Sequence, residues 1–291
     1  MFPRVPDQHK EGKPLVPNGL GVLYVLFTTV YLFAIYFLGI TNPDNNAISA
    51  PLTLAACILF GGFMGLLDDW MDLKWRYKAF MPLIASLPLI YFAYAYHLRT
   101  EIMLPFDGVI EFSNAYYFIV IPLIVMIVTN TVNMLGGLNG LESCTPAIVL
   151  LSLLGISEYT TGSFTFMIVP ILFWLVIAVL NFKGSIFVGN SGSFAIGMTI
   201  ASFAIVADVK SGLLISILPY VFNSALILLT IFFVRKRAAV AFDGKKLVSD
   251  HRRSLVTLIT YKRPMTERKV VTIVLAIFVV FSVLAFLAQV L

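Results

Sequence analysis

The chain has 291 residues, of which 59% are hydrophobic and 12% charged, and its formal net charge is +5. Soluble domains carry about 25% charged residues, so this composition excludes a soluble globular protein and indicates an integral membrane protein. In such a chain the positive charge is typical of cytoplasmic loops rather than of a nucleic-acid-binding surface. Cys57 and Cys144 both lie in apolar segments and indicate no disulfide framework.

Uncharged, mostly apolar windows recur along the sequence. A helix that crosses the hydrocarbon core needs about 20 such residues. The windows, of which the fifth is the shortest, are Leu20–Ile40, Ala47–Leu67, Ala79–Tyr96, Ser113–Leu135, Ser143–Ser157, Tyr159–Phe182, Ile186–Ala207, Gly212–Val234 and Val270–Leu291. The sequence therefore predicts one all-α polytopic membrane domain over residues 1–291, with about nine transmembrane helices.

The basic residues are distributed unevenly between the two sets of alternating loops. Eighteen lysines and arginines fall in one set, whereas the other contains only Arg99 and Lys210. Because cytoplasmic loops are enriched in Lys and Arg, the first set is predicted to be cytoplasmic, with the amino terminus inside and the carboxyl terminus outside. Between the third and fourth windows, EIMLPFDGVIEF (residues 101–112) has an Asp-Gly pair between apolar runs, which predicts a short external β-hairpin.

The second window ends in two adjacent carboxylates, Asp68 and Asp69, which are followed by Asp72 and Lys78. One interpretation is a solvated helix end. However, carboxylates are unexpected at a cytoplasmic helix end, where basic residues dominate, and polar side chains at membrane depth tend to be functional. Two acids beside a lysine also suit magnesium-phosphate chemistry, so we favour a functional role.

Three further polar segments fall on the predicted cytoplasmic side. They are NTVNMLGGLNGLE (residues 130–142), FVGNSGSF (187–194) and a basic loop over residues 235–269 that opens with Arg-Lys-Arg. Each has a structural alternative: helix packing through small residues, a glycine turn, or binding of anionic lipid headgroups by the basic loop. The same segments could contact a ligand backbone or a phosphorylated substrate. The sequence thus places its unusual polar material on one face of the membrane.

Together and in this order, these segments resemble the polyprenyl-phosphate N-acetylhexosamine-1-phosphate transferases, glycosyltransferase family 4. The resemblance is greatest to the eukaryotic and archaeal branch that transfers N-acetylglucosamine phosphate to dolichyl phosphate. It rests on LLDDWMDLKWRYKAFMPLIASLPL, NTVNMLGGLNGLE, FVGNSGSFAIGM and RKR followed by DGKKLVSDHRRSL, and it covers nearly the whole chain.

Two features depart from the family pattern. The family usually has ten spans, and the motif PDQHKEGKPLVPNGLG, which normally follows the first, lies here at residues 6–21. The family's first span thus looks absent from this sequence: either the start of the gene is misassigned, or the enzyme works with nine spans. Asn190 stands where the family normally has an aspartate that ligates magnesium. An amide oxygen can still coordinate this ion, but without charge. We therefore expect weaker magnesium binding, with altered or lost activity, unless the nucleotide diphosphate or Asp68 and Asp69 supply the missing negative charge.

The resemblance implies a role for each matching residue. Asn133 and Asn190 would hold Mg²⁺, or Mn²⁺ in its place, and Lys78 would pair with the phosphates. Asp69, with Asp68, would orient or deprotonate the lipid phosphate. Substrate contacts would come from Asn139 and Phe187 to uracil, from Arg235, Lys236 and Arg237 to the sugar and phosphates, and from Trp75 near the lipid tail.

The implied reaction transfers N-acetylglucosamine-1-phosphate from UDP-N-acetylglucosamine to dolichyl or another polyprenyl phosphate and releases UMP. This is the first step of lipid-linked oligosaccharide assembly for protein N-glycosylation. The expected partners are these two substrates and membrane lipid, with no nucleic acid, and a homodimer stays open. The site would face the cytoplasm in an archaeal cell membrane, or in the endoplasmic reticulum membrane of a eukaryote.

Three alternatives remain. The chain could be a relative that uses another UDP-sugar or polyprenyl phosphate, or a catalytically impaired homologue, for which Asn190 is the reason. A transporter is disfavoured because transporters place polar sites near the bilayer midplane, often within inverted repeats. Here the polar segments cluster at one face, and the sequence shows no internal repeat.

Overall fold

The structure of the chain is a computed structural model that describes residues 2–39, 49–104, 108–160, 165–235 and 238–290. Its α-helices are α1 (Gly21–Phe37), α2 (Ala50–Met71), α3 (Trp75–Ala85), α4 (Leu87–Ala95), α5 (Ile121–Met134), α6 (Leu141–Thr160), α7 (Ile168–Phe182), α8 (Gly189–Val206), α9 (Lys210–Ser216), α10 (Leu218–Leu229), α11 (Leu255–Ile259) and α12 (Glu267–Val290). Short π- or 3-10 segments are η1 (Tyr116–Val120), η2 (Thr165–Met167) and η3 (Thr230–Val234).

The predicted all-α polytopic membrane fold is confirmed. Within the described residues, six helices are long and apolar enough to cross a membrane, namely α2, α3 with α4, η1 with α5, α6, α8 and α12. The pair α9 and α10–η3 forms a seventh span if its 53° bend lies within the membrane. The first and sixth predicted windows contain α1 and α7, which are apolar but have 17 and 15 residues. The fifth window, the shortest in sequence, lies within a 20-residue helix, α6, that extends beyond it at both ends.

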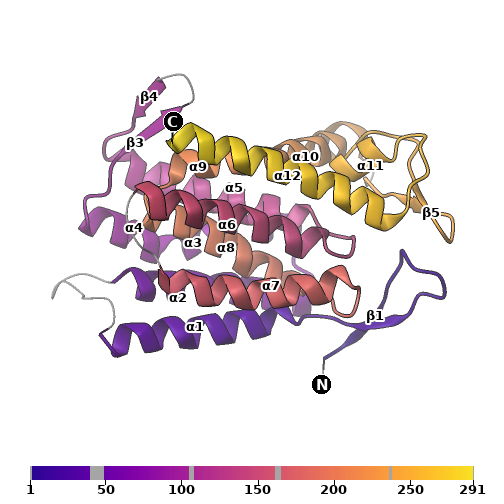
Figure 1. The fold of residues 1–291 in the computed structure, drawn as a ribbon, viewed down its shortest axis with the longest axis horizontal. Helices are drawn as coiled ribbons and strands as arrows, with labels where there is room; N and C mark the ends of the chain where they lie inside the picture. The colour runs from indigo at the N-terminus through magenta and orange to yellow at the C-terminus, as the bar shows by residue number, and fades with distance from the viewer. Residues whose placement is uncertain (1, 40–48, 105–107, 161–164, 236–237, 291) are drawn as a thin grey trace.

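Helix α8 occupies the centre of the bundle and packs mainly against α2 and α5 (Figure 1). Every residue from Ser191 to Val206 is buried. Small residues in this helix allow neighbouring backbones to approach closely, as is common between membrane helices. At Gly65 of α2, a Cβ atom would lie 2.1 Å from the backbone oxygen of Asn190. This close approach fixes the end of α2 against the start of α8.

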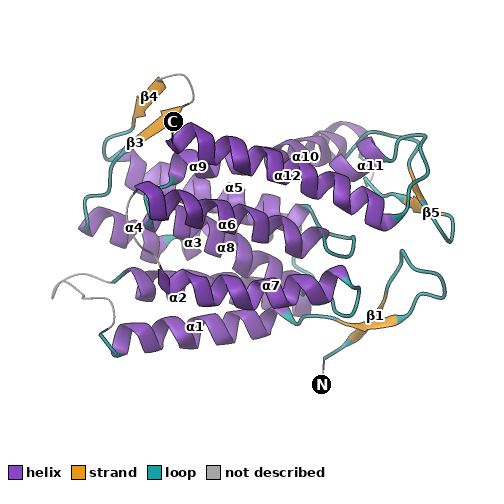
Figure 2. Ribbon diagram, in the orientation of Figure 1, coloured by secondary structure: helices purple, strands orange, loops and turns teal. Residues whose placement is uncertain are grey.

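The two ends of the bundle differ. Three antiparallel strand pairs are present in the described chain: β1 (Arg4–Pro6) with β2 (Leu15–Pro17), β3 (Glu101–Leu104) with β4 (Gly108–Glu111), and β5 (Ala241–Phe242) with β6 (Leu247–Val248). Figure 2 shows β3 and β4 at one end of the bundle, and β1 and β5 at the other. The predicted β-hairpin is thus present, although residues 105–107 of its turn lie outside the described residues.

The end with β3 and β4 is the one predicted to be external. Its two basic residues, Arg99 and Lys210, both form ion pairs with Asp208. The backbone N–H of Met103 in β3 donates to the Ser211 hydroxyl, 3.1 Å away, at the start of α9. The hairpin is therefore attached to the α8–α9 junction, and the loops with the remaining basic residues lie at the opposite, predicted cytoplasmic end.

Candidate active site

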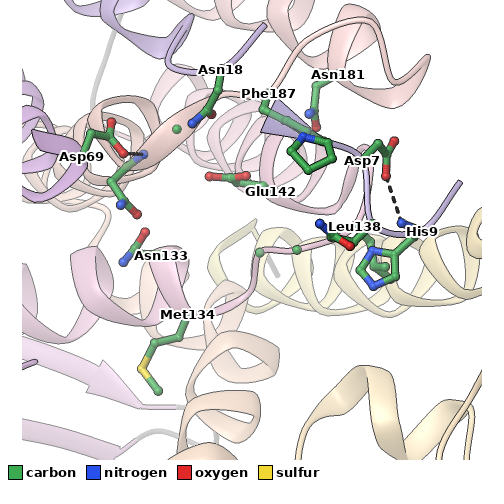
Figure 3. Close-up of a pocket in the computed structure, with 16 residues that line it drawn as sticks. Asp7, His9, Asn18, Asp69, Asn133, Met134, Leu138, Glu142, Asn181 and Phe187 are labelled. Carbon is green, nitrogen blue, oxygen red and sulfur yellow. Dashed lines mark hydrogen bonds between the residues drawn. The ribbon is translucent and has the colours of Figure 1, made fainter. Parts of the chain in front are cut away.

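A cavity of about 560 Å³ opens at the predicted cytoplasmic end of the bundle (Figure 3). Its wall combines the segment before α1, the ends of α2 and α5, the starts of α6 and α8, and the loops between them. The lining residues are Pro6, Asp7, Gln8, His9, Asn18, Asp69, Asn133, Met134, Gly136, Gly137, Leu138, Glu142, Asn181, Phe187, Gly189 and Asn190. Four residues predicted as site residues from separate parts of the sequence, Asp69, Asn133, Phe187 and Asn190, therefore share one cavity.

Asp69 joins the end of α2 to the start of α8. Its Oδ1 accepts a hydrogen bond from the backbone N–H of Asn190, and its Oδ2 accepts one from the N–H of Ser191, each at 3.0 Å. These N–H groups belong to the first turn of α8, where they have no partner within the helix. The carboxylate of Asp69 thus caps α8 from another helix, and the positive end of the α8 dipole stabilises its charge.

Asp68 lies outside the cavity lining although it is the neighbour of Asp69. It is buried, and its Oδ1 lies 2.7 Å from the Nζ of Lys78 and accepts a hydrogen bond from the backbone N–H of Leu73 at 3.1 Å. Lys78, predicted to pair with substrate phosphates, is also absent from the lining. Asp68 and Lys78 are therefore not among the residues that line the cavity, and their contacts connect the end of α2 to α3.

The two predicted magnesium ligands come from facing helices. Asn133 lies in the last turn of α5, and its Oδ1 accepts a hydrogen bond from the Ser193 hydroxyl of α8 at 2.6 Å. Asn190 lies in the first turn of α8. In the described part of the chain, no group of three or more His, Cys, Asp or Glu side chains could hold a metal ion. A metal at this cavity would therefore need amide oxygens and substrate oxygens as ligands as well.

Of the two residues predicted to contact uracil, only Phe187 lines the cavity. Its backbone N–H donates to the carbonyl of Pro17 at 2.8 Å, which fixes it against the segment before α1. Asn139 instead points into a buried polar contact. Its Nδ2 donates to Asp7 Oδ2 at 2.8 Å and to Glu267 Oε1 at 3.1 Å, and its backbone N–H donates to the same Glu267 oxygen. Asn139 thus ties the amino-terminal segment to the start of α12.

The predicted sugar-binding residues lie beside the cavity or outside the described residues. Arg235 follows η3 as an exposed residue with a φ of 54°, and it is not on the cavity lining. Lys236 and Arg237 lie outside the described residues. The next residues, 238–240, line a second cavity of about 240 Å³. The two cavities share five lining residues: His9, Met134, Gly136, Gly137 and Leu138. The basic loop therefore borders a space that adjoins the main cavity.

Trp75, predicted near the lipid tail, is exposed at the start of α3. Its ring lies 6.3 Å from the ring of Phe232 in an edge-to-face contact, and the guanidinium of Arg76 lies 5.7 Å from the Trp75 ring centre. Exposed aromatic side chains with a cation nearby are typical of the membrane–water interface. This position suits a contact with lipid.

Sequence reasoning missed the amino-terminal part of the cavity wall. Asp7, Gln8, His9 and Asn18 line the cavity, but none of them was predicted as a site residue. The only signal was the motif at residues 6–21, which precedes the first span and has no periodicity that would indicate its tertiary contacts. Glu142 was also missed, although it is the last residue of the quoted segment NTVNMLGGLNGLE.

Comparison with known proteins identifies the family. Residues 51–208, more than half of the chain, match the sequence profile of glycosyl transferase family 4. The chain belongs to this family. The resemblance stated from the four sequence motifs is thereby confirmed, and with it the class of enzyme, a membrane transferase.

The relatives in this family carry related names. A protein of Saccharolobus solfataricus, provisionally named UDP-N-acetylglucosamine–dolichyl-phosphate N-acetylglucosaminephosphotransferase, is 29% identical over 97% of this chain and 87% of its own length. The Dictyostelium discoideum enzyme of that name is 26% identical over 75% of this chain and 62% of its own length. A phospho-N-acetylmuramoyl-pentapeptide-transferase of Nautilia profundicola is 27% identical over 76% of this chain and 68% of its own length.

Proposed function

We propose that this family member transfers N-acetylglucosamine-1-phosphate from UDP-N-acetylglucosamine to dolichyl or another polyprenyl phosphate. The observation that carries the proposal is the larger of the two described cavities at the cytoplasmic end, which brings Asp69, Asn133, Phe187 and Asn190 together from distant parts of the chain. Its volume falls within the range of small-molecule sites, about 300–1,000 Å³. The names of the archaeal and eukaryotic relatives support this donor and acceptor.

The position of the cavity suits one water-soluble substrate and one membrane-bound substrate. A nucleotide sugar arrives from water, whereas the lipid phosphate stays in the bilayer. The cavity lies at the helix ends, and the exposed aromatic residues Trp75 and Phe232 lie at the starts and ends of neighbouring helices. We infer that the acceptor phosphate enters from the membrane side of the cavity and the donor from its open cytoplasmic side.

In the proposed reaction, an oxygen of the lipid phosphate attacks the sugar-side phosphorus of the donor. A new P–O bond forms to the lipid phosphate, the P–O bond to the uridine-side phosphate breaks, and UMP leaves with that electron pair. The product is a lipid–pyrophosphate–sugar. Because two anions must meet, charge neutralisation and in-line positioning dominate the catalytic demand.

The residues of the cavity would contribute in different ways. Asp69 would orient the lipid phosphate and accept a proton from its monoprotonated form, whose second pKa is near 6. Phe187 would stack on the uracil ring. Asp68 would act indirectly, because its ion pair with Lys78 shapes the turn behind Asp69.

A magnesium ion fits the chemistry of the cavity wall. Carboxylate and amide oxygens are ligands that Mg²⁺ takes in proteins, and Asn133 and Asn190 present such oxygens from facing helices. When bound, the ion would neutralise diphosphate charge and polarise the P–O bond that breaks. Asn133 would be oriented for this role by the hydroxyl of Ser193.

A substrate panel tests the proposal. Membranes containing the full chain are supplied with labelled UDP-N-acetylglucosamine and dolichyl phosphate, and lipid-linked label and free UMP are measured. We expect both products in equal amounts and neither without lipid phosphate. Transfer only from another UDP-sugar, or only to undecaprenyl phosphate, would instead support one of the alternative specificities. No product from any pair would identify a catalytically impaired homologue.

The cellular role follows from the same reaction. We propose that the product is the first intermediate of lipid-linked oligosaccharide assembly for protein N-glycosylation, made on the cytoplasmic face of the membrane. Deletion of the gene in its host should therefore shift glycoproteins to their unglycosylated mass.

A further inference from the structure

The main cavity is negatively charged although its proposed ligand is an anion. Among its lining residues within the described chain are three carboxylates, Asp7, Asp69 and Glu142, and no lysine or arginine. A diphosphate that enters such a cavity would be repelled by these charges. If the proposed function holds, on which this inference rests, positive charge must therefore accompany the donor into the site.

Two of the three carboxylates already have partners. Asp7 accepts a hydrogen bond from the side chain of Asn139 at 2.8 Å and lies 3.4 Å from the Nζ of Lys10. Asp69 accepts two backbone hydrogen bonds from the first turn of α8. These contacts hold both carboxylates in place and offset part of their charge.

Glu142 differs from the other two carboxylates. It lies in the first turn of α6, and none of the hydrogen bonds and ion pairs among the described residues involves its carboxylate. Figure 3 shows this carboxylate directed into the cavity between Asp69 and Asp7, on the side that faces Asn133. Both Glu142 and Asp69 line this cavity, so their negative charges repel each other across it. This repulsion is relieved when a carboxylate takes up a proton or when a bound cation joins the two groups.

The surroundings of Glu142 leave room for such a cation. The nearest wall is the glycine-containing loop between α5 and α6, and even a Cβ added at Gly136 would lie 3.8 Å from a Glu142 oxygen. The amide of Asn133 lies across the same cavity, and Asn190 contributes an amide where a charged ligand is expected. The carboxylate missing at position 190 thus has a counterpart on α6.

We propose that Glu142 is the charged oxygen ligand of the divalent cation that accompanies the donor diphosphate, and that it supplies the negative charge that Asn190 lacks. Hard divalent cations such as Mg²⁺ and Mn²⁺ prefer oxygen ligands and bind more tightly as ligand charge increases. Glu142 on α6, Asn133 on α5 and Asn190 on α8 then surround the ion from three helices.

The test measures Mn²⁺ binding to the purified full chain in detergent by electron paramagnetic resonance, because bound Mn²⁺ loses the signal of the free ion. Titrations with Mn²⁺ alone and with Mn²⁺ plus UDP compare the wild type with Glu142→Gln. We expect the dissociation constant to increase about tenfold or more in the variant. Glu158→Gln, which removes a carboxylate at the far end of the same helix, should leave it unchanged.

A charge-restoring variant makes the test specific. Adding Asn190→Asp to Glu142→Gln returns a carboxylate to the cavity and should recover most of the lost Mn²⁺ affinity. Wild-type affinity in Glu142→Gln would overturn the proposal, as would a double variant no better than the single one. If Glu142→Gln does not fold, Glu142→Asp decides: it keeps the charge but withdraws the oxygens, so unchanged affinity would equally overturn the proposal.

The result separates this inference from the proposed function. If the wild-type protein transfers N-acetylglucosamine phosphate but Glu142→Gln binds Mn²⁺ as tightly as the wild type, the metal assignment fails and the transferase proposal stands. If Mn²⁺ binding depends on Glu142 but no donor is consumed, the metal assignment stands and the transferase proposal fails.

Discussion

The carboxylate of Asp69 accepts a hydrogen bond from the backbone N–H of Asn190, with 3.0 Å between Oδ1 and the nitrogen. These residues are 121 positions apart in sequence, and they join the end of α2 to the start of α8. The same contact connects the proposed acid–base residue to the segment that carries a proposed metal ligand. Any change that separates the two helices should therefore disturb both functions together.

Gly65 tests the close approach that this contact requires. In Gly65→Ala the new Cβ would meet the backbone oxygen of Asn190 at 2.1 Å, so α2 and α8 must separate. We expect a loss of about 1–3 kcal/mol of stability, seen as a lower melting temperature in detergent, together with loss of transfer.

Gly155→Ala is the matched control for Gly65→Ala. Gly155 also lies within a membrane helix, but a Cβ there would come no closer than 3.7 Å to the ring of Phe286. Because Ala favours the helix over Gly by about 1 kcal/mol, this variant should melt at or above the wild-type temperature. Equal destabilisation by both substitutions would contradict the assigned role of Gly65.

The pair of Asp68 and Lys78 should act as one unit. Asp68 is buried, whereas Lys78 is partly exposed and also lies 4.0 Å from Asp72. Lys78→Met leaves the buried carboxylate without its cation and Asp68→Asn removes the closer of the two carboxylates, so each should lower the melting temperature, Lys78→Met by more. The double variant should lose less than the sum of the two, with a coupling of about 0.5–3 kcal/mol. Strictly additive losses in this cycle would show that the 2.7 Å contact contributes nothing.

The side chain of Asn139 should hold the amino-terminal segment in its folded position. Asn139→Ala removes the side-chain hydrogen bonds to Asp7 and Glu267 and leaves Asp7 buried with fewer partners, at a cost of about 1–3 kcal/mol. We expect faster hydrogen exchange in residues 4–17, measured by mass spectrometry, while the β3–β4 hairpin is unchanged. Unaltered exchange in residues 4–17 would indicate that other contacts hold this segment.

Asn190→Asp should increase the affinity of the cavity for magnesium, the opposite of the effect expected for Glu142→Gln. The new carboxylate adds a charged oxygen to the cavity, so the magnesium concentration needed for half-maximal transfer should fall by about tenfold. The measurement is a magnesium titration of transfer at saturating donor and acceptor. An unchanged half-maximal concentration would argue that position 190 does not contact the ion.

Much of the fold could be predicted because membrane insertion is a local property of the sequence. Each apolar window contains a helix, and the uneven distribution of lysine and arginine indicated which loops would share an end. Helix lengths were less predictable, since α1 ends before its apolar window does and α7 begins nine residues after the start of its window. The polar residues of α6 did not shorten that helix, because Glu142 lies in its first turn and the hydroxyl groups of Ser143 and Thr145 form hydrogen bonds within the bundle.

Site residues could be predicted only where they belong to a short sequence motif with recognisable polar or aromatic residues. Asp69, Asn133, Phe187 and Asn190 lie in recognisable segments and do line one cavity. Which of two adjacent aspartates faces that cavity depends on the rotation of α2, and the sequence does not show this. Asp7 and His9 reach the cavity lining from the β1–β2 hairpin, a tertiary contact with no local signal in the sequence.

The release of UMP tests the account most directly. UMP is measured with UDP-N-acetylglucosamine, dolichyl phosphate and magnesium for the wild type, Asp69→Asn and Asp72→Asn. Asp72 is fully exposed and has a φ of 46°, a conformation that asparagine tolerates, so it is the matched control. We predict lipid-dependent release by the wild type and Asp72→Asn, and a decrease of about a hundredfold or more in Asp69→Asn. Undiminished release by Asp69→Asn would contradict a catalytic centre at this cavity.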